Sequence, residues 1–123
     1  MKISLAESRV MDVLWGAERP LASEEVTQTL ADDQQWAHAT VRSLLNRLVN
    51  KKAVEARMEG RRYLYQPLLA REAYAQAESE TLLERLFGGR LTPFVTQFAN
   101  SQRLSEQEVA ALTSLIERLD RDR

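Results

Sequence analysis

The residues whose side chains could do chemistry gather between positions 37 and 67. This stretch carries seven Lys and Arg residues against two Asp and Glu, whereas the rest of the chain carries ten against sixteen. An acidic protein with one basic segment concentrates its positive charge for a polyanion. Guanidinium, hydroxyl and amide groups are those that bind phosphate oxygens and base edges in DNA grooves. The segment therefore predicts a surface for double-stranded DNA.

Residues 40–49 have the periodicity of a helix with one apolar face. Val41, Leu44, Leu45 and Leu48 recur at i, i+3, i+4 and i+7, which is one stripe of a helix packed on a core. The opposite face is polar and suited to a DNA groove, and a basic hairpin follows it. The predicted DNA contacts are His38, Thr40, Arg42, Ser43, Arg47, Lys51, Arg57, Arg61 and Arg62.

These contacts differ in what they are expected to read. Arg42 can pair with guanine, the commonest base contact, whereas Arg57, Arg61 and Arg62 on the hairpin are expected to meet phosphate. On an isolated helix Arg42 would be read as a solvated charge; the hairpin favours DNA contact instead. His38 is either an exposed or capping residue or a pH-sensitive phosphate contact.

Composition excludes several classes of protein. The chain of 123 residues has 44% apolar and 28% charged residues and a pI near 5.9, as expected of one or two small globular domains. It has no cysteine and one histidine, and no phosphate-cradling glycine loop or nucleophile–base pair. We expect no enzyme activity, cofactor or metal site. No apolar run predicts a membrane span or signal peptide, so a cytoplasmic protein is expected.

The first 67 residues predict three helices and a hairpin. Helices are expected from a capping box at Ser4, from about Ser23, and up to Lys51-Lys52. Two strands, 54–58 and 62–66, flank Glu59-Gly60-Arg61. The first helix should face inward with Leu5, Val10, Val13 and Leu14. Trp15 and Trp36 should anchor the core, and Tyr63 and Tyr65 should pack between hairpin and core.

The rest of the chain is expected to be helical and to need a partner. A helix over 70–87 ends at Gly88-Gly89, another starts with Thr92 as N-cap and Pro93 following, and Ser105 opens the last. A tail of this length encloses too little core alone, so a homodimer is expected. The predicted dimer residues are Leu82, Leu86, Phe87, Phe94, Val95, Phe98, Val109, Leu112, Ile116 and Leu119.

The expected fold is mainly α with a small β-hairpin wing. A winged helix-turn-helix domain, residues 1–68, would precede a helical dimerisation domain, residues 69–123.

With these elements in place, the chain resembles the penicillinase and methicillin-resistance repressor family (BlaI/MecI/CopY type) along nearly its whole length. The resemblance rests on the order and spacing of several motifs. They are Ala6-Glu7, Val10-Met11, Leu14-Trp15, residues 40–48, Lys51-Lys52, Glu59-Gly60-Arg61, Tyr63, Tyr65, residues 86–89 and the acidic helix after Leu104-Ser105.

The resemblance implies a dimeric winged-helix repressor that binds inverted repeats. It places base reading on Thr40, Arg42 and Ser43, and backbone contacts on Arg47 and Arg61. Some members are inactivated when a membrane sensor's signal leads to their cleavage; the matching bond here is Gln97–Phe98, with Gln in place of the family's Asn.

Two departures concern the third helix, and a third concerns copper. Ala37-His38-Ala39 replaces the family's Ser-Pro-Lys, which removes a capping hydroxyl and a cation. Ala53 replaces the usual Gly after Lys51-Lys52, so we expect a different helix exit. Copper-responsive members use a cysteine motif that this chain lacks.

Two other functions stay open from the sequence. A winged-helix adaptor could bind an acidic protein with the same basic face. A small-molecule-responsive regulator could hold an effector in the helical tail, although the tail's apolar residues look committed to packing and dimerisation.

Overall fold

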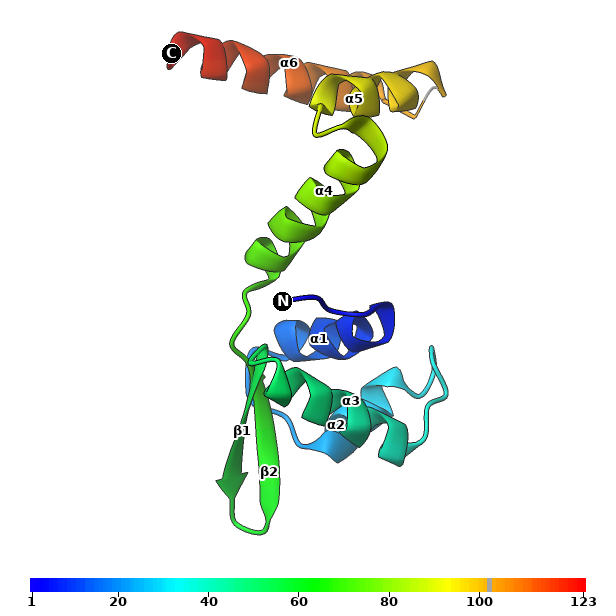
Figure 1. The fold of residues 1–123 in the computed structure, drawn as a ribbon, viewed down its shortest axis with the longest axis vertical. Coiled ribbons are helices and arrows are strands. Elements are labelled where there is room, and N and C mark those ends of the chain that lie inside the picture. The colour runs from blue at the N-terminus through cyan, green and yellow to red at the C-terminus, as the bar shows by residue number, and fades with distance from the viewer. Residues whose placement is uncertain (102) are drawn as a thin grey trace. The chain divides into compact units, whose positions relative to one another are not determined.

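The computed structural model describes residues 1–101 and 103–123, which form two compact units, Met1–Ala75 and Gln76–Arg123 (Figure 1). The first unit holds three helices, a two-stranded antiparallel hairpin and the start of a fourth helix. Its elements are α1 (Leu5–Ala17), α2 (Ser23–Leu30), α3 (His38–Asn50), β1 (Val54–Glu59), β2 (Arg62–Pro67) and the first turn of α4 (Arg71–Phe87). The expected mainly helical fold with a hairpin wing is confirmed. A division into domains at residue 68 stays a prediction.

The capping box at the start of α1 is confirmed. Ser4 Oγ accepts a hydrogen bond from the Glu7 amide at 3.1 Å, and the Glu7 carboxylate accepts one from the Ser4 amide at 2.8 Å. The helix continues one residue past the expected Gly16. It ends at Ala17, where Glu18 takes the left-handed conformation with φ 59°.

The prediction for the inward face of α1 was wrong at Leu5, which is 72% exposed. Val10 and Leu14 are buried as expected, and Met11 is buried beside them. The buried stripe therefore runs from position 7 through 10 and 11 to 14. Leu5 is the first residue of the helix and lies off that stripe.

The apolar stripe of α3 is confirmed as the centre of the core. Val41, Leu45 and Leu48 are fully buried and Leu44 is nearly so. Because all four apolar side chains lie inward, the polar side chains between them must point outward.

The left-handed residue at the exit from α3 is Lys52 and not Ala53. Lys52 takes the left-handed conformation with φ 65°. Its amide donates to Val49 O and the Ala53 amide to Leu48 O, both at 3.0 Å, which is the pairing of a Schellman motif. Ala53 is fully buried, like Leu48. The strand β1 therefore starts at Val54 directly from a closed helix end.

The hairpin is narrow and is fixed at its base. Glu59 pairs with Arg62 across a two-residue turn, and Gly60, with φ 66°, supplies the left-handed residue that the turn needs. At the base, Tyr65 exchanges two backbone hydrogen bonds with Leu21, at 2.8 and 3.0 Å. The linker between α1 and α2 thus holds β2.

The two tryptophans pack against the core, as predicted, and Trp15 also binds the start of α4. Its Nε1 donates to Leu69 O at 2.8 Å, and its ring centroid lies 5.7 Å from that of Tyr74. The Arg71 guanidinium lies 5.5 Å from the Trp15 ring centroid. These contacts hold the first turn of α4 against α1 within the first unit.

The second unit holds the remainder of α4, α5 (Leu91–Asn100) and α6 (Glu106–Arg121). Gly88-Gly89 ends α4 as expected, and Ser105 caps α6 by accepting from the Glu108 amide at 3.1 Å. The expected N-cap at Thr92 was wrong. The helix α5 begins at Leu91, so Pro93 still lies in the first turn, where its missing N–H costs nothing.

The packing of the second unit is thin. Phe94 stacks edge-on against Phe87 and Phe98, with ring centroids 5.7 and 5.0 Å apart. Among the described residues of this unit, no side chain is fully buried. Of the helices the structure describes, none is both long and apolar enough to cross a membrane.

A buried ion pair joins α1 to the end of α3. The Glu7 carboxylate is 1% exposed, and its Oε1 lies 2.6 Å from Lys51 Nζ, which also donates to Lys2 O at 2.8 Å. Burial acts to raise the pKa of Glu7, but the hydrogen bonds from Lys51 and Ser4 outweigh it and leave the pKa lowered. A lowered folded-state pKa stabilises the protein above the unfolded pKa of Glu, and this stabilisation is lost as the pH falls through the folded value.

We expect Lys51→Met to reduce the free energy of unfolding by about 1–3 kcal/mol at neutral pH, because a buried carboxylate loses its partner. The deficit should narrow as the pH falls and the unpaired Glu7 becomes protonated. Urea denaturation at a series of pH values measures it. Lys52→Met removes the same charge from the neighbouring residue and serves as the control; equal losses for both variants would contradict the prediction.

Candidate DNA interface

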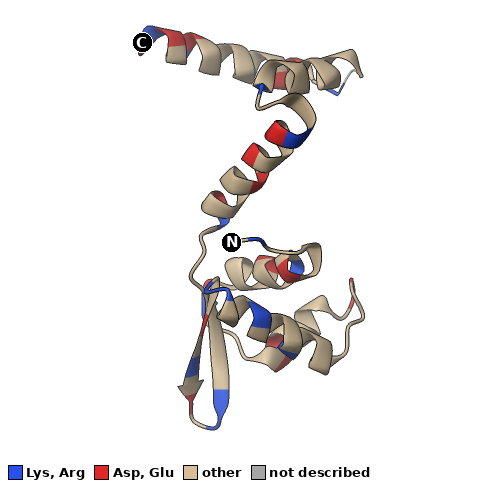
Figure 2. Ribbon diagram, viewed as in Figure 1, with Lys and Arg blue, Asp and Glu red and all other residues tan. Residues whose placement is uncertain are grey.

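The polar face of α3 is open to solvent along its length. Thr40, Arg42, Ser43 and Arg47 are all exposed, and they alternate with the buried apolar stripe as the helical period requires. Lys and Arg colour α3 and both strands of the hairpin in Figure 2. The predicted base-reading residues therefore lie on one accessible face of one helix.

The start of α3 is held by a side chain of α2. Ala37 occupies the N-cap position without a side-chain hydrogen bond, in keeping with the loss of a capping hydroxyl. His38 is half-buried, and its Nε2 lies 2.9 Å from Ser23 Oγ. This hydrogen bond joins the first residues of α2 and α3. A phosphate contact by His38 stays a prediction.

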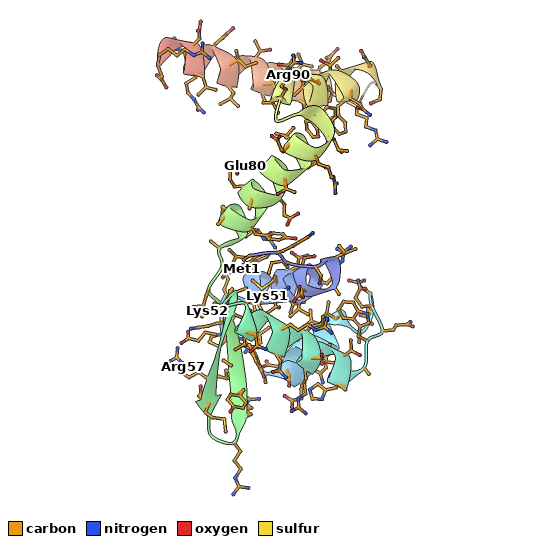
Figure 3. The ribbon with its side chains drawn as sticks, in the orientation of Figure 1. Met1, Lys51, Lys52, Arg57, Glu80 and Arg90 are labelled. Atoms are coloured by element: carbon orange, nitrogen blue, oxygen red, sulfur yellow. The ribbon has the colours of Figure 1, made fainter. Side chains whose placement is uncertain are left out.

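Lys51 has a structural partner that the sequence did not indicate. Figure 3 shows it close to the N-terminal segment, and its ammonium group is bound by Glu7 and by Lys2 O. A DNA contact by Lys51 stays a prediction, but this ammonium group already neutralises a buried carboxylate. Spacing alone could not reveal the pair, because its members are 44 positions apart.

The hairpin presents its cations around the turn. Arg57, Arg61 and Arg62 are exposed, and Arg57 points outward in Figure 3. In the register of the strands Arg57 lies opposite Leu64 and Arg62 lies opposite Glu59. The three guanidinium groups are therefore free of the core, as a phosphate-binding role requires.

The prediction that both hairpin tyrosines pack against the core was right for Tyr65 and wrong for Tyr63. Tyr65 is 7% exposed, whereas Tyr63 is 52% exposed and its cross-strand partner Met58 is 55% exposed. The two-residue alternation of strands, together with the turn at Gly60, would have placed Met58 and Tyr63 opposite each other on one face. The sequence does not show how far the core extends along the hairpin, and this decides which of the two tyrosines is buried.

Two pKa shifts in this unit come partly from charges on neighbouring elements. Burial raises the pKa of Tyr65, and the positive charge of Arg42 on α3 opposes that rise. The pKa of Glu25 on α2 is lowered, first by its hydrogen bond from Arg19 and also by the charge of Arg62. A charge on α3 thus acts on β2, and a charge on β2 acts on α2.

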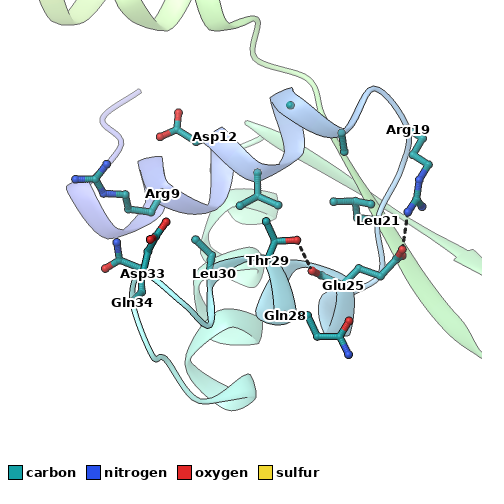
Figure 4. A pocket seen from close by; sticks show the side chains of 13 residues that line it. Arg9, Asp12, Arg19, Leu21, Glu25, Gln28, Thr29, Leu30, Asp33 and Gln34 are labelled. Carbon is teal, nitrogen blue, oxygen red and sulfur yellow. Dashed lines mark hydrogen bonds and ion pairs between the residues drawn. The ribbon is translucent and has the colours of Figure 1, made fainter.

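A groove of about 880 Å³ runs along α1 and α2 (Figure 4). Its walls carry Arg9 and Arg19 but also Asp12, Glu25 and Asp33, and Arg19 is held by Glu25 at 2.7 Å. These opposite charges give it no positive excess. A polyanion is therefore drawn to α3 and the hairpin and not to this groove.

The arrangement can bind and position a duplex, and its residues are not those of a reaction centre. Among the described residues no group of three or more His, Cys, Asp or Glu side chains is placed to hold a metal ion. The site consists of a helix face with hydrogen-bonding side chains and a flanking basic hairpin. These are the parts of a winged-helix DNA reader.

The chain is similar to known repressors along most of its length. Residues 3–118 match the penicillinase repressor family. The chain is 31% identical to the penicillinase repressor of Bacillus licheniformis over 116 residues, which covers 94% of this chain and 90% of that protein.

Two solved structures agree with this match. The DNA-binding domain of the repressor BlaI shares 33% identity at a TM-score of 0.54, covering 59% of this chain and 88% of that one. Bacillus licheniformis BlaI, as a monomeric form in complex with the blaP half-operator, shares 32% identity at a TM-score of 0.52, covering 60% and 89%. The family consists of repressors and not of enzymes. This chain belongs to the penicillinase repressor family.

Proposed function

We propose that this protein is a transcriptional repressor that binds double-stranded DNA through α3 and the hairpin. The observation that carries the proposal is the exposed polar face of α3, with Arg42 and Arg47, joined to a basic hairpin in one compact unit. Helix α3 enters the major groove and the hairpin contacts the flanking backbone. The complex of a similar repressor with its half-operator supports this assignment.

The second unit supplies the contacts of a homodimer. Val109, Leu112, Ile116 and Leu119 lie on one side of α6 at 3-4-3 spacing and are 36–63% exposed. Leu86 of α4 is 58% exposed as well. A second copy of the chain buries these side chains with an identical surface, which is the simplest symmetric solution.

A two-fold symmetric dimer accounts for an inverted-repeat operator. Each protomer places one α3 in a major groove, and the half-sites are separated by about one helical turn of DNA or a multiple of it. Repression is steric, because an occupied promoter excludes the polymerase. An adaptor for an acidic protein would select no palindrome from random DNA.

Derepression follows from cleavage of the Gln97–Phe98 bond in response to a sensor. This bond lies inside α5, where Phe98 packs on Phe94 and its carbonyl accepts hydrogen bonds from the Ser101 hydroxyl and the Arg103 amide. A protease can reach this peptide bond only after the end of α5 opens locally. Loss of α6 then removes its apolar side from the dimer and weakens DNA binding.

We expect Arg42→Ala to reduce sequence discrimination and Arg61→Ala to reduce affinity for every DNA sequence. A palindromic operator is first selected from random DNA with the full-length protein. Arg42→Ala should then lose about 1–3 kcal/mol of discrimination at one base pair. Arg61→Ala should weaken binding to all sequences and lower the slope of log affinity against log salt by about one. Equal losses by Arg42→Ala on operator and random DNA would contradict base reading.

We expect Ile116→Asp to shift the protein from dimer to monomer in sedimentation analysis, because a charge is placed in an apolar seam. Operator affinity should fall with it, since two half-sites are no longer joined. Ser114→Asp adds the same charge to the same helix away from the seam and should leave the dimer intact. A monomeric wild-type protein at micromolar concentration would overturn the dimer.

We expect cells exposed to a penicillin to yield two fragments, residues 1–97 and 98–123, by mass spectrometry of the recovered protein. Replacing Phe98 by Ala changes the residue that follows the cleaved bond and should reduce cleavage. Derepression with the protein intact would show that another route releases it.

A further inference from the structure

The hairpin has one apolar face that continues beyond the core. Val54, Ala56 and Met58 alternate on β1 and lie opposite Pro67, Tyr65 and Tyr63 on β2. At the base of the hairpin Val54 is 1% exposed and Tyr65 is 7% exposed. Towards the turn Met58 and Tyr63 are more than half exposed. The apolar stripe thus starts in the core and ends in solvent.

The other face of the hairpin carries mostly polar and charged side chains, as expected of a face exposed to solvent. It carries the pairs Glu55–Gln66, Arg57–Leu64 and Glu59–Arg62. A single exposed apolar side chain needs no explanation. Here, however, two large ones lie directly opposite each other across the strands, at the end of a hairpin whose remaining exposed side chains are mostly charged.

The apolar face of the hairpin carries a tyrosine that is influenced by a charge on α3. Tyr65 lies on it, belongs to the core, and is close enough to Arg42 for that charge to act on its hydroxyl. The rings of Tyr63 and Tyr65 are 6.5 Å apart, so Tyr63 continues the same surface outward. Met58 and Tyr63 therefore continue the Tyr65 face of the hairpin towards its tip.

Resting on the proposed function, we propose that Met58 and Tyr63 form a nonpolar contact with the deoxyribose rings of the bound duplex. Arg61 at the hairpin turn and Arg42 of α3, whose charge acts on Tyr65 of this same face, favour a polyanion as the occupant. Between its phosphates the DNA backbone exposes the carbon atoms of its sugars, which are the nonpolar surface that this pair can cover. The polar side chains of α3 form the continuous remainder of the interface.

Such a contact adds affinity without releasing counterions. Phosphate contacts make the affinity depend on salt, whereas burial of apolar surface does not. The contact also depends on where the sugars lie, so it senses the width of the groove and not the identity of a base. Met58 and Tyr63 are therefore shape-reading residues beside the charge-pairing arginines.

The test uses the full-length protein and the operator selected from random DNA. Met58→Ala and Tyr63→Ala should each weaken operator binding about five-fold, from the apolar area that each leaves uncovered. The slope of log affinity against log salt should stay at the wild-type value in both variants. Tyr63→Phe should bind like the wild type, because the ring is retained.

The control is Leu64→Ala, which shortens an apolar side chain of the same strand on the opposite face. It separates a DNA contact from a general loss of hairpin stability, which thermal unfolding of each variant also monitors. If Leu64→Ala weakens binding as much as Tyr63→Ala does, the pair only stabilises the hairpin and the proposal is overturned. Wild-type affinity in Met58→Ala and Tyr63→Ala overturns it as well.

The outcome for Arg61→Ala tells the two proposals apart. If that variant lowers the salt slope while Met58→Ala and Tyr63→Ala bind normally, DNA binding stands and the sugar contact fails. If the wild-type protein selects no DNA, the proposed function fails and the sugar contact fails with it.

Discussion

Burial of the apolar stripe of α3 determines the direction in which its polar face points. Val41, Leu44, Leu45 and Leu48 each gain roughly 1.5–3 kcal/mol from leaving water, and all four lie in the core. Turning the helix about its axis would expose these side chains and draw Arg42 or Arg47 into an apolar interior, where an unpaired charge is strongly disfavoured. The exposed guanidinium groups are therefore a consequence of core packing, and the proposed DNA surface depends on that packing.

The end of α3 transmits this orientation to the hairpin. The Schellman motif at Lys52 and Ala53 closes the helix, and Lys51 binds the buried carboxylate of Glu7 on α1. Strand β1 follows at once, while Leu21 holds β2 from the other side. With both strands fixed at the base, α3 and the hairpin present their positive charges from one compact unit.

The second unit has the opposite character. Its three aromatic rings pack on one another, yet the apolar side of α6 remains open and no described side chain of the unit is fully buried. Its helices gain little hydrophobic stabilisation as a single copy. This is the physical reason for proposing a dimer. It also favours local opening at the end of α5, because few contacts oppose the unwinding of Phe98.

The sequence by itself determined the helices, the hairpin and the face of α3, because hydrophobic period, turn residues and caps are local signals. It also determined the positive segment and the family resemblance. Only the tertiary structure decided that Lys51 pairs with Glu7, that Leu5 and Tyr63 are exposed, and that His38 meets Ser23. Such contacts join residues far apart in the chain, and burial depends on how deep the core reaches. A periodic pattern gives the side on which a residue lies, but the depth of its burial depends on the elements packed against it.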